Sequence, residues 1–277
     1  MRLRILAVCL AAAALAPILA PKSAGAIISP AGRQSRTSGA AIAGGDIFVW
    51  SSHSAKTSGS GCTVAFAVRS IRTGKRGVLT AGHCVATVPG GPSYLVHQTA
   101  SAPGGDRTSP GVLLGRVTAS AFRLGTDGDS AFVKLAPHVA TAPLLYVGGW
   151  RSHTTIPVAG KGKLEPGTEV CYSGAATGEH CGFTVVGGSQ TVSFVSAHHQ
   201  KVAIGHEWRA TGASCTSRRG DSGSPVYTRV GGVAYAVGIL SGGQLKAGTC
   251  PFYFTPVSLA LKQLGLKLVK TASAPTV

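Results

Sequence analysis

Gly220-Asp221-Ser222-Gly223-Ser224-Pro225 sets a serine between two glycines and other small residues. Glycine is favoured where the backbone needs a positive φ or a close approach to a ligand, and small neighbours leave the Ser222 hydroxyl open to solvent. A serine hydroxyl is a poor nucleophile at neutral pH unless a base removes its proton and donors stabilise the oxyanion that it creates. The stretch therefore predicts a nucleophile whose partners stand elsewhere in the chain.

A histidine and two aspartates earlier in the chain are candidates for these partners. His83 lies in the small-residue stretch Thr80-Ala81-Gly82-His83-Cys84, which can hold the imidazole in one tautomer. Asp127 and Asp129 compete for the place of the carboxylate that orients the imidazole. A buried acid is expected where a strand turns inward, and an apolar run begins at Ala131.

From about residue 42 to about residue 264 the chain resembles the chymotrypsin-like serine peptidases, and more closely their bacterial secreted streptogrisin and α-lytic protease branch. The resemblance implies an all-β fold of two packed six-stranded antiparallel Greek-key barrels with a C-terminal helix. It implies a catalytic triad of His83, Asp129 and Ser222, in which Ser222 attacks the peptide carbonyl and His83 transfers the proton. The family acid directly precedes x-Ala and an apolar residue, a pattern that Asp129 satisfies and Asp127 does not. Asp127 is then expected to be a turn residue.

The resemblance also assigns groups that would bind the substrate. The backbone N–H groups of Gly220 and Ser222 would form the oxyanion hole. Ser241-Gly242-Gly243 would pair with the substrate backbone as an added strand, and the serine would also touch the triad acid. Trypsin-like members carry an acid in the region of Ala213-Ser214-Cys215-Thr216, and glutamate-specific relatives carry a histidine where this chain has Leu240. Because neither is present, an apolar P1 side chain is expected.

Composition also favours an all-β protein. Charged residues make up only 13% of the 277 residues, whereas glycine occurs 39 times and proline 15 times, which is typical of short strands joined by turns. The formal net charge is +17, but the basic residues are scattered and are not interleaved with aromatic ones. No specific nucleic-acid site is therefore expected, and the charge indicates non-specific attraction to polyanions or the cell envelope. Polypeptide substrates, a monomeric state and no cofactor complete this expectation.

Apart from Cys9, which lies in an apolar run near the start, the cysteines predict a disulfide framework whose pairing the sequence alone leaves open. The resemblance selects the pairs Cys62–Cys84, Cys171–Cys181 and Cys215–Cys250. Metal binding is not expected, because no Cys-x-x-Cys pair occurs and His206-Glu207 lacks the second histidine of a zinc peptidase helix.

Residues 1–26 have the features of a secretory signal. A basic start is followed by an apolar run over residues 5–20 and by the small-residue site Ala24-Gly25-Ala26. A membrane anchor is the alternative, but Pro17 interrupts the run and the run is shorter than the roughly 20 residues that cross a bilayer. Residues 27–41 would be a linker or short pro-segment. The peptidase domain would then span residues 42–277, with a crossover between barrels at about residues 136–154, in a secreted protein.

The C-terminal segment and Asp221 give two further expectations. Residues 257–270 after Pro256 suggest an amphipathic helix; the leucines partly alternate as in a strand, and the resemblance decides for the helix. A buried Asp221 must be paired, and the streptogrisin branch pairs it with an arginine where this chain has Tyr172. Tyr172, the nearby arginines at 218 and 219, and the Ile42 amine are the candidates. The Tyr172 hydroxyl, with an arginine compensating the charge, is the expected partner.

Two other functions fit parts of the sequence. A catalytically silent homologue that binds polyanions would explain the charge, but such homologues usually lose the serine or the histidine, and this chain keeps both. An esterase would require a Gly-x-Ser-x-Gly motif with the histidine last in the chain, and neither condition holds. A secreted serine endopeptidase is therefore the prediction.

Overall fold

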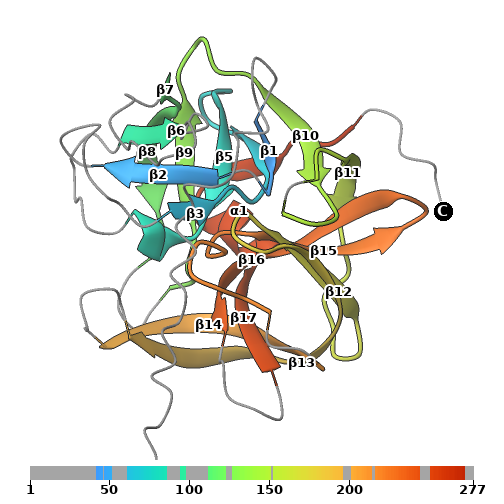
Figure 1. Cartoon of the computed structure of the whole chain (residues 1–277). Helices are drawn as coiled ribbons and strands as arrows, with labels where there is room; N and C mark the ends of the chain where they lie inside the picture. The colour runs from blue at the N-terminus through green and yellow to red at the C-terminus, as the bar shows by residue number, and fades with distance from the viewer. Residues whose placement is uncertain are drawn as a thin grey trace, which may run out of the picture.

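A computed structural model describes residues 42–45, 47–51, 61–85, 94–97, 112–122, 127–150, 152–195, 201–213, 216–243 and 250–271. The described residues form strands, one 3-10 turn and one α-helix, as Figure 1 shows. The elements of the N-terminal half are β1 (Ile42–Gly44), β2 (Ile47–Ser51), β3 (Gly61–Thr63), β4 (Ala67–Ser70), β5 (Arg76–Thr80), η2 (Gly82–Cys84), β6 (Tyr94–His97), β7 (Val112–Leu113), β8 (Gly115–Ser120) and β9 (Ala131–Leu135). Those of the C-terminal half are β10 (Thr141–Tyr146), β11 (Thr155–Lys161), β12 (Glu169–Gly174), β13 (Gly178–Val195), β14 (Lys201–Gly212), β15 (Pro225–Val230), β16 (Val233–Gly243), β17 (Cys250–Pro256), α1 (Val257–Gln263) and β18 (Leu266–Leu268).

Six strands of the C-terminal half form a closed antiparallel ring. The order β15-β12-β13-β14-β17 is closed by β16, which pairs with both β15 and β17. Closure leaves no free sheet edge in the ring, so every strand has two neighbours. Buried side chains fill its interior, with aromatic ring centroids 5.0–5.8 Å apart. They are Val170, Tyr172, Phe183, Val185, Ala210, Val226, Val237, Leu240, Phe252 and Phe254.

Two sheets contain the strands of the N-terminal half except β1, which pairs with β10, and β18 from the C-terminal end joins one of them. One has the order β18-β4-β5-β9-β8 and the other the order β3-β2-β6-β7. The all-β architecture with a C-terminal helix agrees with the expectation. The expected count of six strands in each of two barrels is not confirmed, because the described pairings close a ring only in the C-terminal half.

The two halves share a hydrophobic core. One buried cluster contains Phe66 and Leu79 from the N-terminal half, Tyr227 and Ile239 from the ring, and Val257 from α1. In Figure 1, α1 lies between the N-terminal strands and β16. Each such side chain, when fully buried, contributes about 1.5–3 kcal/mol, so the helix helps to fix the halves against each other.

The helix is shorter than the sequence predicted. It spans Val257–Gln263, and the following leucines form β18, which pairs with β4. Gly265, with φ of 62°, turns the chain between the two elements. The expected helix over residues 257–270 is therefore wrong beyond Gln263, because the leucines at 266 and 268 gain strand hydrogen bonds and burial that a helix would not give them.

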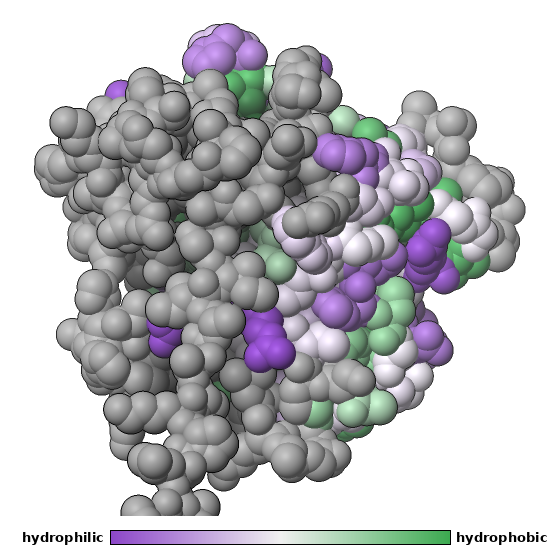
Figure 2. Space-filling view, in the orientation of Figure 1, coloured by the Kyte–Doolittle hydropathy of each residue, from purple (hydrophilic) through white to green (hydrophobic). Residues whose placement is uncertain are grey.

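The described surface carries few large apolar side chains. Exposed ones are Ile71, Val186 and Val230. Figure 2 shows hydrophilic and hydrophobic residues interspersed over the described part of the visible face. Among the described residues, no helix is both long and apolar enough to cross a membrane.

Candidate active site

His83 is delivered by strand β5 and the 3-10 turn that follows it. The turn packs directly against Ser130 and Phe122, since a Cβ on Gly82 would lie 2.4 Å from Phe122 Cβ and 3.0 Å from the Ser130 carbonyl oxygen. Only glycine fits there without a shift of the neighbouring chain. The sequence Thr80-Ala81-Gly82-His83 thus brings the histidine beside the segment that precedes β9.

His83 and Asp129 are hydrogen-bonded twice. The His83 backbone N–H donates to Asp129 Oδ1 at 2.7 Å, and Nδ1 of the ring pairs with Oδ2 at 2.5 Å. The Asp129 side chain is fully buried, whereas 33% of the His83 side chain is exposed. Burial lowers the pKa of His83, but the charge of Asp129 and its hydrogen bond outweigh burial and raise the pKa above its ordinary value.

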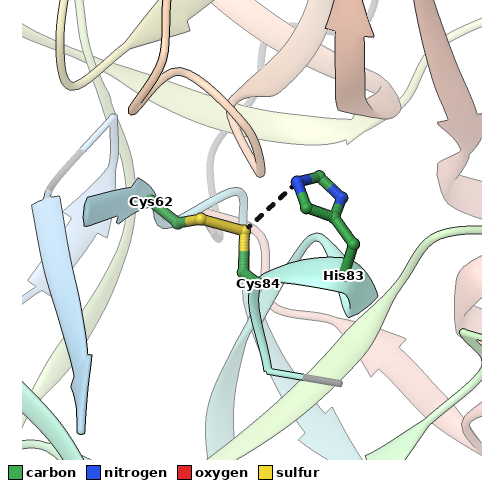
Figure 3. A group of neighbouring side chains, drawn as sticks. All are labelled: Cys62, His83 and Cys84. Atoms are coloured by element: carbon green, nitrogen blue, oxygen red, sulfur yellow. Dashed lines mark hydrogen bonds between the residues drawn. A yellow bond between two sulfur atoms is a disulfide. The ribbon is translucent and has the colours of Figure 1, made fainter. Parts of the chain in front are cut away.

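The other ring nitrogen of His83 faces a disulfide. Figure 3 shows Nε2 directed toward Sγ of Cys84, at 3.9 Å, and Cys84 bonded to Cys62. The sulfurs and His83 lie close enough together to suggest a metal site, as do Cys171, Glu179 and Cys181. In both groups the cysteines form a disulfide, so they offer no thiolate to a metal.

The loop around Ser222 needs glycines for its backbone. Gly220 and Gly223 have φ of 101° and 86°, a region that disfavours other residues. A Cβ on Gly223 would also lie 2.3 Å from the Thr63 carbonyl oxygen. The loop is held by hydrogen bonds from Thr63 N–H to Ser222 O and from Gly223 N–H to Leu240 O, both 2.7 Å long.

The Ser222 hydroxyl and the expected oxyanion donors form no hydrogen bond to other described residues. Within the described part of the chain, no hydrogen bond joins the Ser222 hydroxyl to His83. The N–H groups of Gly220 and Ser222 likewise donate to no described residue. Both groups thus remain available to a substrate carbonyl.

Thr63 contacts this loop and was missed by sequence reasoning. Its buried hydroxyl donates to Gly220 O at 2.7 Å and accepts from Ala175 N–H at 2.9 Å. Thr63 lies on β3 in the N-terminal half, so its hydroxyl ties two loops of the ring to the other half. No sequence signal distinguishes this threonine, because the pairing depends on contacts between residues more than 100 positions apart.

Asp221 is paired, but not with the expected Tyr172 hydroxyl. Its oxygens accept hydrogen bonds from the N–H groups of Ala176, Thr177 and Arg218 and from the Thr177 hydroxyl, at 2.8–3.1 Å. Burial raises the pKa of Asp221 to about 6, while these donors lower it. The backbone N–H of Ile42, which is inside the chain here, donates to the Ala140 carbonyl.

Tyr172 has a different partner from the expected one. Its hydroxyl lies 2.7 Å from Thr216 Oγ1 and is not hydrogen-bonded to Asp221, so the expected Tyr172–Asp221 bond is wrong. Among the described residues, Asp221 also forms no ion pair with Arg218 or Arg219. Burial and the nearby charge of Asp221 raise the pKa of Tyr172, which keeps its phenol neutral. Four neutral donors thus hold Asp221, in place of the single arginine that the resemblance implied.

The residues expected to bind substrate lie at the end of β16. A Cβ on Gly243 would lie 2.2 Å from Ser217 Oγ, so only glycine allows this close approach. The Leu240 side chain is fully buried in the core of the ring. The Ser241 hydroxyl is buried without a hydrogen-bond partner, so the expected contact of this serine with Asp129 is not a hydrogen bond in the described structure. Gly242 pairs with Tyr253 on β17.

The disulfides Cys62–Cys84 and Cys171–Cys181 are present as the resemblance implied. Cys250 is also disulfide-bonded. Cys215, its expected partner, lies outside the described residues. Asp127 is half-buried and lies two residues before Asp129, in the segment that leads to β9.

Comparison with known proteins adds family evidence to this geometry. The family model described as Trypsin matches residues 49–264. Streptogrisin-C of Streptomyces griseus is 31% identical over 235 residues, which cover 82% of this chain. The chain spans only 41% of the length of that relative.

Solved structures agree on the fold. Thermobifida fusca protease A is 27% identical, with a TM-score of 0.60, over 84% of this chain and 100% of that chain. Nocardiopsis protease is 24% identical, with a TM-score of 0.54, over 84% of this chain and 100% of that chain. The latter likeness concerns the fold alone. These structures confirm that the two halves and the terminal helix form a trypsin-like protease fold.

Proposed function

The chain belongs to the trypsin family of serine proteases, and from this membership we propose that it is a secreted serine endopeptidase with a triad of His83, Asp129 and Ser222. One observation carries the assignment of the triad. His83 is fixed through two hydrogen bonds to the buried Asp129, while a loop in the other half carries Ser222, whose hydroxyl bonds to no other described residue. A histidine with only a structural role would not require hydrogen bonds from both its backbone N–H and its ring to one buried carboxylate.

The reaction follows from the state of these groups. Asp129 accepts the proton of Nδ1, so the unprotonated Nε2 is the atom that takes the proton of Ser222. As Ser222 attacks, the imidazole becomes charged, and the neighbouring carboxylate stabilises that charge. The N–H groups of Gly220 and Ser222 would receive the oxyanion, each contributing about 2.7–4 kcal/mol to the transition state.

An apolar P1 side chain is part of the proposal. Two side chains near the expected specificity pocket are neutral: Thr216 bonds to the phenol of Tyr172, and the Ser217 hydroxyl lies close to Gly243. A basic P1 side chain would find no carboxylate among them. Peptide libraries with varied P1 residues measure this preference directly, and cleavage mainly after lysine or arginine would contradict it.

Secretion and attraction to polyanions complete the proposal. The apolar segment at residues 5–20 and the disulfides suit an exported protein, and the net charge of +17 suits loose binding to anionic surfaces. Sequencing the N-terminus of the protein recovered from culture medium tests export and locates the cut. Retention of the unprocessed chain in the cell would contradict it.

Active-site labelling tests the proposed activity. A fluorophosphonate should label the full chain once, at Ser222, and Ser222→Ala and His83→Ala should abolish labelling and peptide cleavage. Ser193→Ala, which removes an exposed serine on β13, is the matched control and should change neither. Peptide cleavage by purified Ser222→Ala at the wild-type rate would overturn the proposed function. An unlabelled, folded wild-type protein that binds heparin would favour the silent polyanion-binding homologue.

A further inference from the structure

A second buried carboxyl group lies behind the His83–Asp129 pair. Glu207 is on β14, and its side chain is fully buried. The residue before it, His206, has φ of 60°, and Ser189 on the paired strand has φ of 52°. Such conformations are costly for residues other than glycine and persist only where the surrounding structure imposes them. Both positive-φ conformations thus occur next to the buried acid of β14, Glu207.

Thr255 connects Glu207 to Asp129. The Thr255 hydroxyl donates to Glu207 Oε1 at 2.6 Å, and its oxygen accepts the backbone N–H of Asp129 at 2.6 Å. A hydroxyl has a single proton, so donation to Glu207 turns its lone pairs toward Asp129. Packing is tight here, since a Cβ on Gly128 would lie 2.7 Å from Thr255 Cγ2. Glu207 therefore acts on the backbone of the residue that holds His83.

The surroundings of Glu207 favour the neutral form of its carboxyl group. It forms no ion pair within the described part of the chain. Burial and the charge of Asp129 raise its pKa well above the ordinary range, and the hydrogen bond from Thr255 only partly offsets this. Oε2 of Glu207 is buried and has no hydrogen-bond partner among the described residues. A proton on Oε2 leaves Oε1 free to accept from Thr255.

We propose that Glu207, as a neutral acid, is a positioning residue that fixes the proposed catalytic Asp129 through the hydroxyl of Thr255. This inference rests on the proposed function of the His83–Asp129 pair. Neutrality matters because a second negative charge beside Asp129 would bind the imidazole proton more tightly. Less of His83 would then be the free base that Ser222 requires at neutral pH.

Four variants separate this role from a merely structural one. Glu207→Gln keeps the acceptor of Thr255 and cannot ionise; Glu207→Leu removes the acceptor; Thr255→Val removes the link itself. We expect Glu207→Leu and Thr255→Val to lower kcat by about 10- to 100-fold with KM changed less than about twofold, the size expected for a misplaced catalytic group. Glu207→Gln keeps the acceptor and Thr255→Ser keeps the hydroxyl, so both variants should retain most of the wild-type kcat.

The titration of His83, followed by NMR, is a measurement that a change in stability alone would not alter. In the full chain carrying Ser222→Ala, the disruptive variants should weaken the His83 Nδ1 proton signal, whereas Glu207→Gln should leave the midpoint of His83 unchanged. A lowered midpoint in Glu207→Gln would show that Glu207 is charged at rest and would overturn the proposal. A folded Glu207→Leu protein with wild-type kcat and an unchanged Nδ1 signal would also overturn it.

The NMR measurement keeps the two proposals apart. If the wild type neither cleaves peptides nor reacts with fluorophosphonate, the proposed function fails. The Nδ1 signal still reports whether Glu207 and Thr255 hold Asp129 against His83, because it requires no turnover.

Discussion

At the scale of single residues, the buried acids carry most of the chemistry. Asp129, Glu207 and Asp221 are all fully buried, yet the cost of burying each carboxyl group is offset in a different way. Asp129 pairs with a histidine, Glu207 has a raised pKa and accepts a hydrogen bond from Thr255, and Asp221 accepts hydrogen bonds from neutral donors. A buried carboxyl group without such compensation would cost several kcal/mol, so each arrangement is a requirement of the fold.

Asp221 should make stability depend on pH. Its folded-state pKa, about 6, lies above the ordinary value of an aspartate, so the folded state holds the proton more tightly than the unfolded state. The contribution of Asp221 to stability is therefore fully present below about pH 4 and is lost as pH rises through about 6. Urea unfolding at pH 4, 5, 6 and 7 should show this fall relative to Asp221→Asn.

Thr177→Val is the matched variant for this prediction. It removes the hydroxyl that donates to Asp221 Oδ2, so the pH range of the fall should move upward. Identical pH profiles of the wild type, Asp221→Asn and Thr177→Val would contradict the assignment.

At the scale of elements, the C-terminal segment shows what local pattern can and cannot predict. The alternating leucines at 264, 266 and 268 suit either a strand or one side of a helix, and the resemblance favoured the helix. The structure uses both: α1 ends at Gln263, and Leu266–Leu268 pairs with β4. The choice depends on the free edge of β4, which is distant in sequence and invisible to a local pattern.

Truncation of Leu266 tests the packing of β18. Leu266 is 3% exposed, so Leu266→Ala should lower the free energy of unfolding by about 2–5 kcal/mol. Lys267→Ala, on the exposed side of the same strand, should change it by less than about 0.5 kcal/mol. Equal unfolding free energies for the two variants would mean that β18 does not contribute to the core.

The same contrast holds for the candidate site. His83 and Ser222 follow from their short motifs, because the small neighbours of each are local requirements of the backbone. Thr63, Thr255 and Glu207 carry no motif; their roles arise where strands far apart in the sequence meet. The partner of Asp221 was wrongly predicted as Tyr172 for the same reason, since the donors come from a turn after β12.

At the scale of the whole molecule, the site depends on how the two halves meet. His83 and Asp129 belong to the N-terminal half, and Ser222 belongs to a loop of the ring. Thr63 crosses between them with its N–H to Ser222 O and its hydroxyl to Gly220 O. A change at this residue should therefore alter stability and activity together.

Thr63→Val tests that connection. The change leaves Gly220 O and Ala175 N–H buried without their partner, at a cost of about 1–3 kcal/mol for each group, and should lower kcat/KM because the loop shifts. Thr63→Ser keeps the hydroxyl and should stay close to wild type in both denaturant unfolding and peptide hydrolysis. Wild-type kcat/KM in a folded Thr63→Val protein would show that the loop holds its shape without this link.

The donors of Asp221 bear on how such an enzyme would be switched on. They are two amides and a hydroxyl of one turn and an amide of the Ser222 loop itself, and none of them is a chain end. The Ile42 N–H is already used inside a sheet, by the Ala140 carbonyl. Because these donors already hold Asp221 while Ile42 is inside the chain, we expect the Ser222 loop to reach its geometry without a proteolytic cut. Restraint of the enzyme inside the producing cell would then have to come from delayed folding, prompt export or a separate inhibitor.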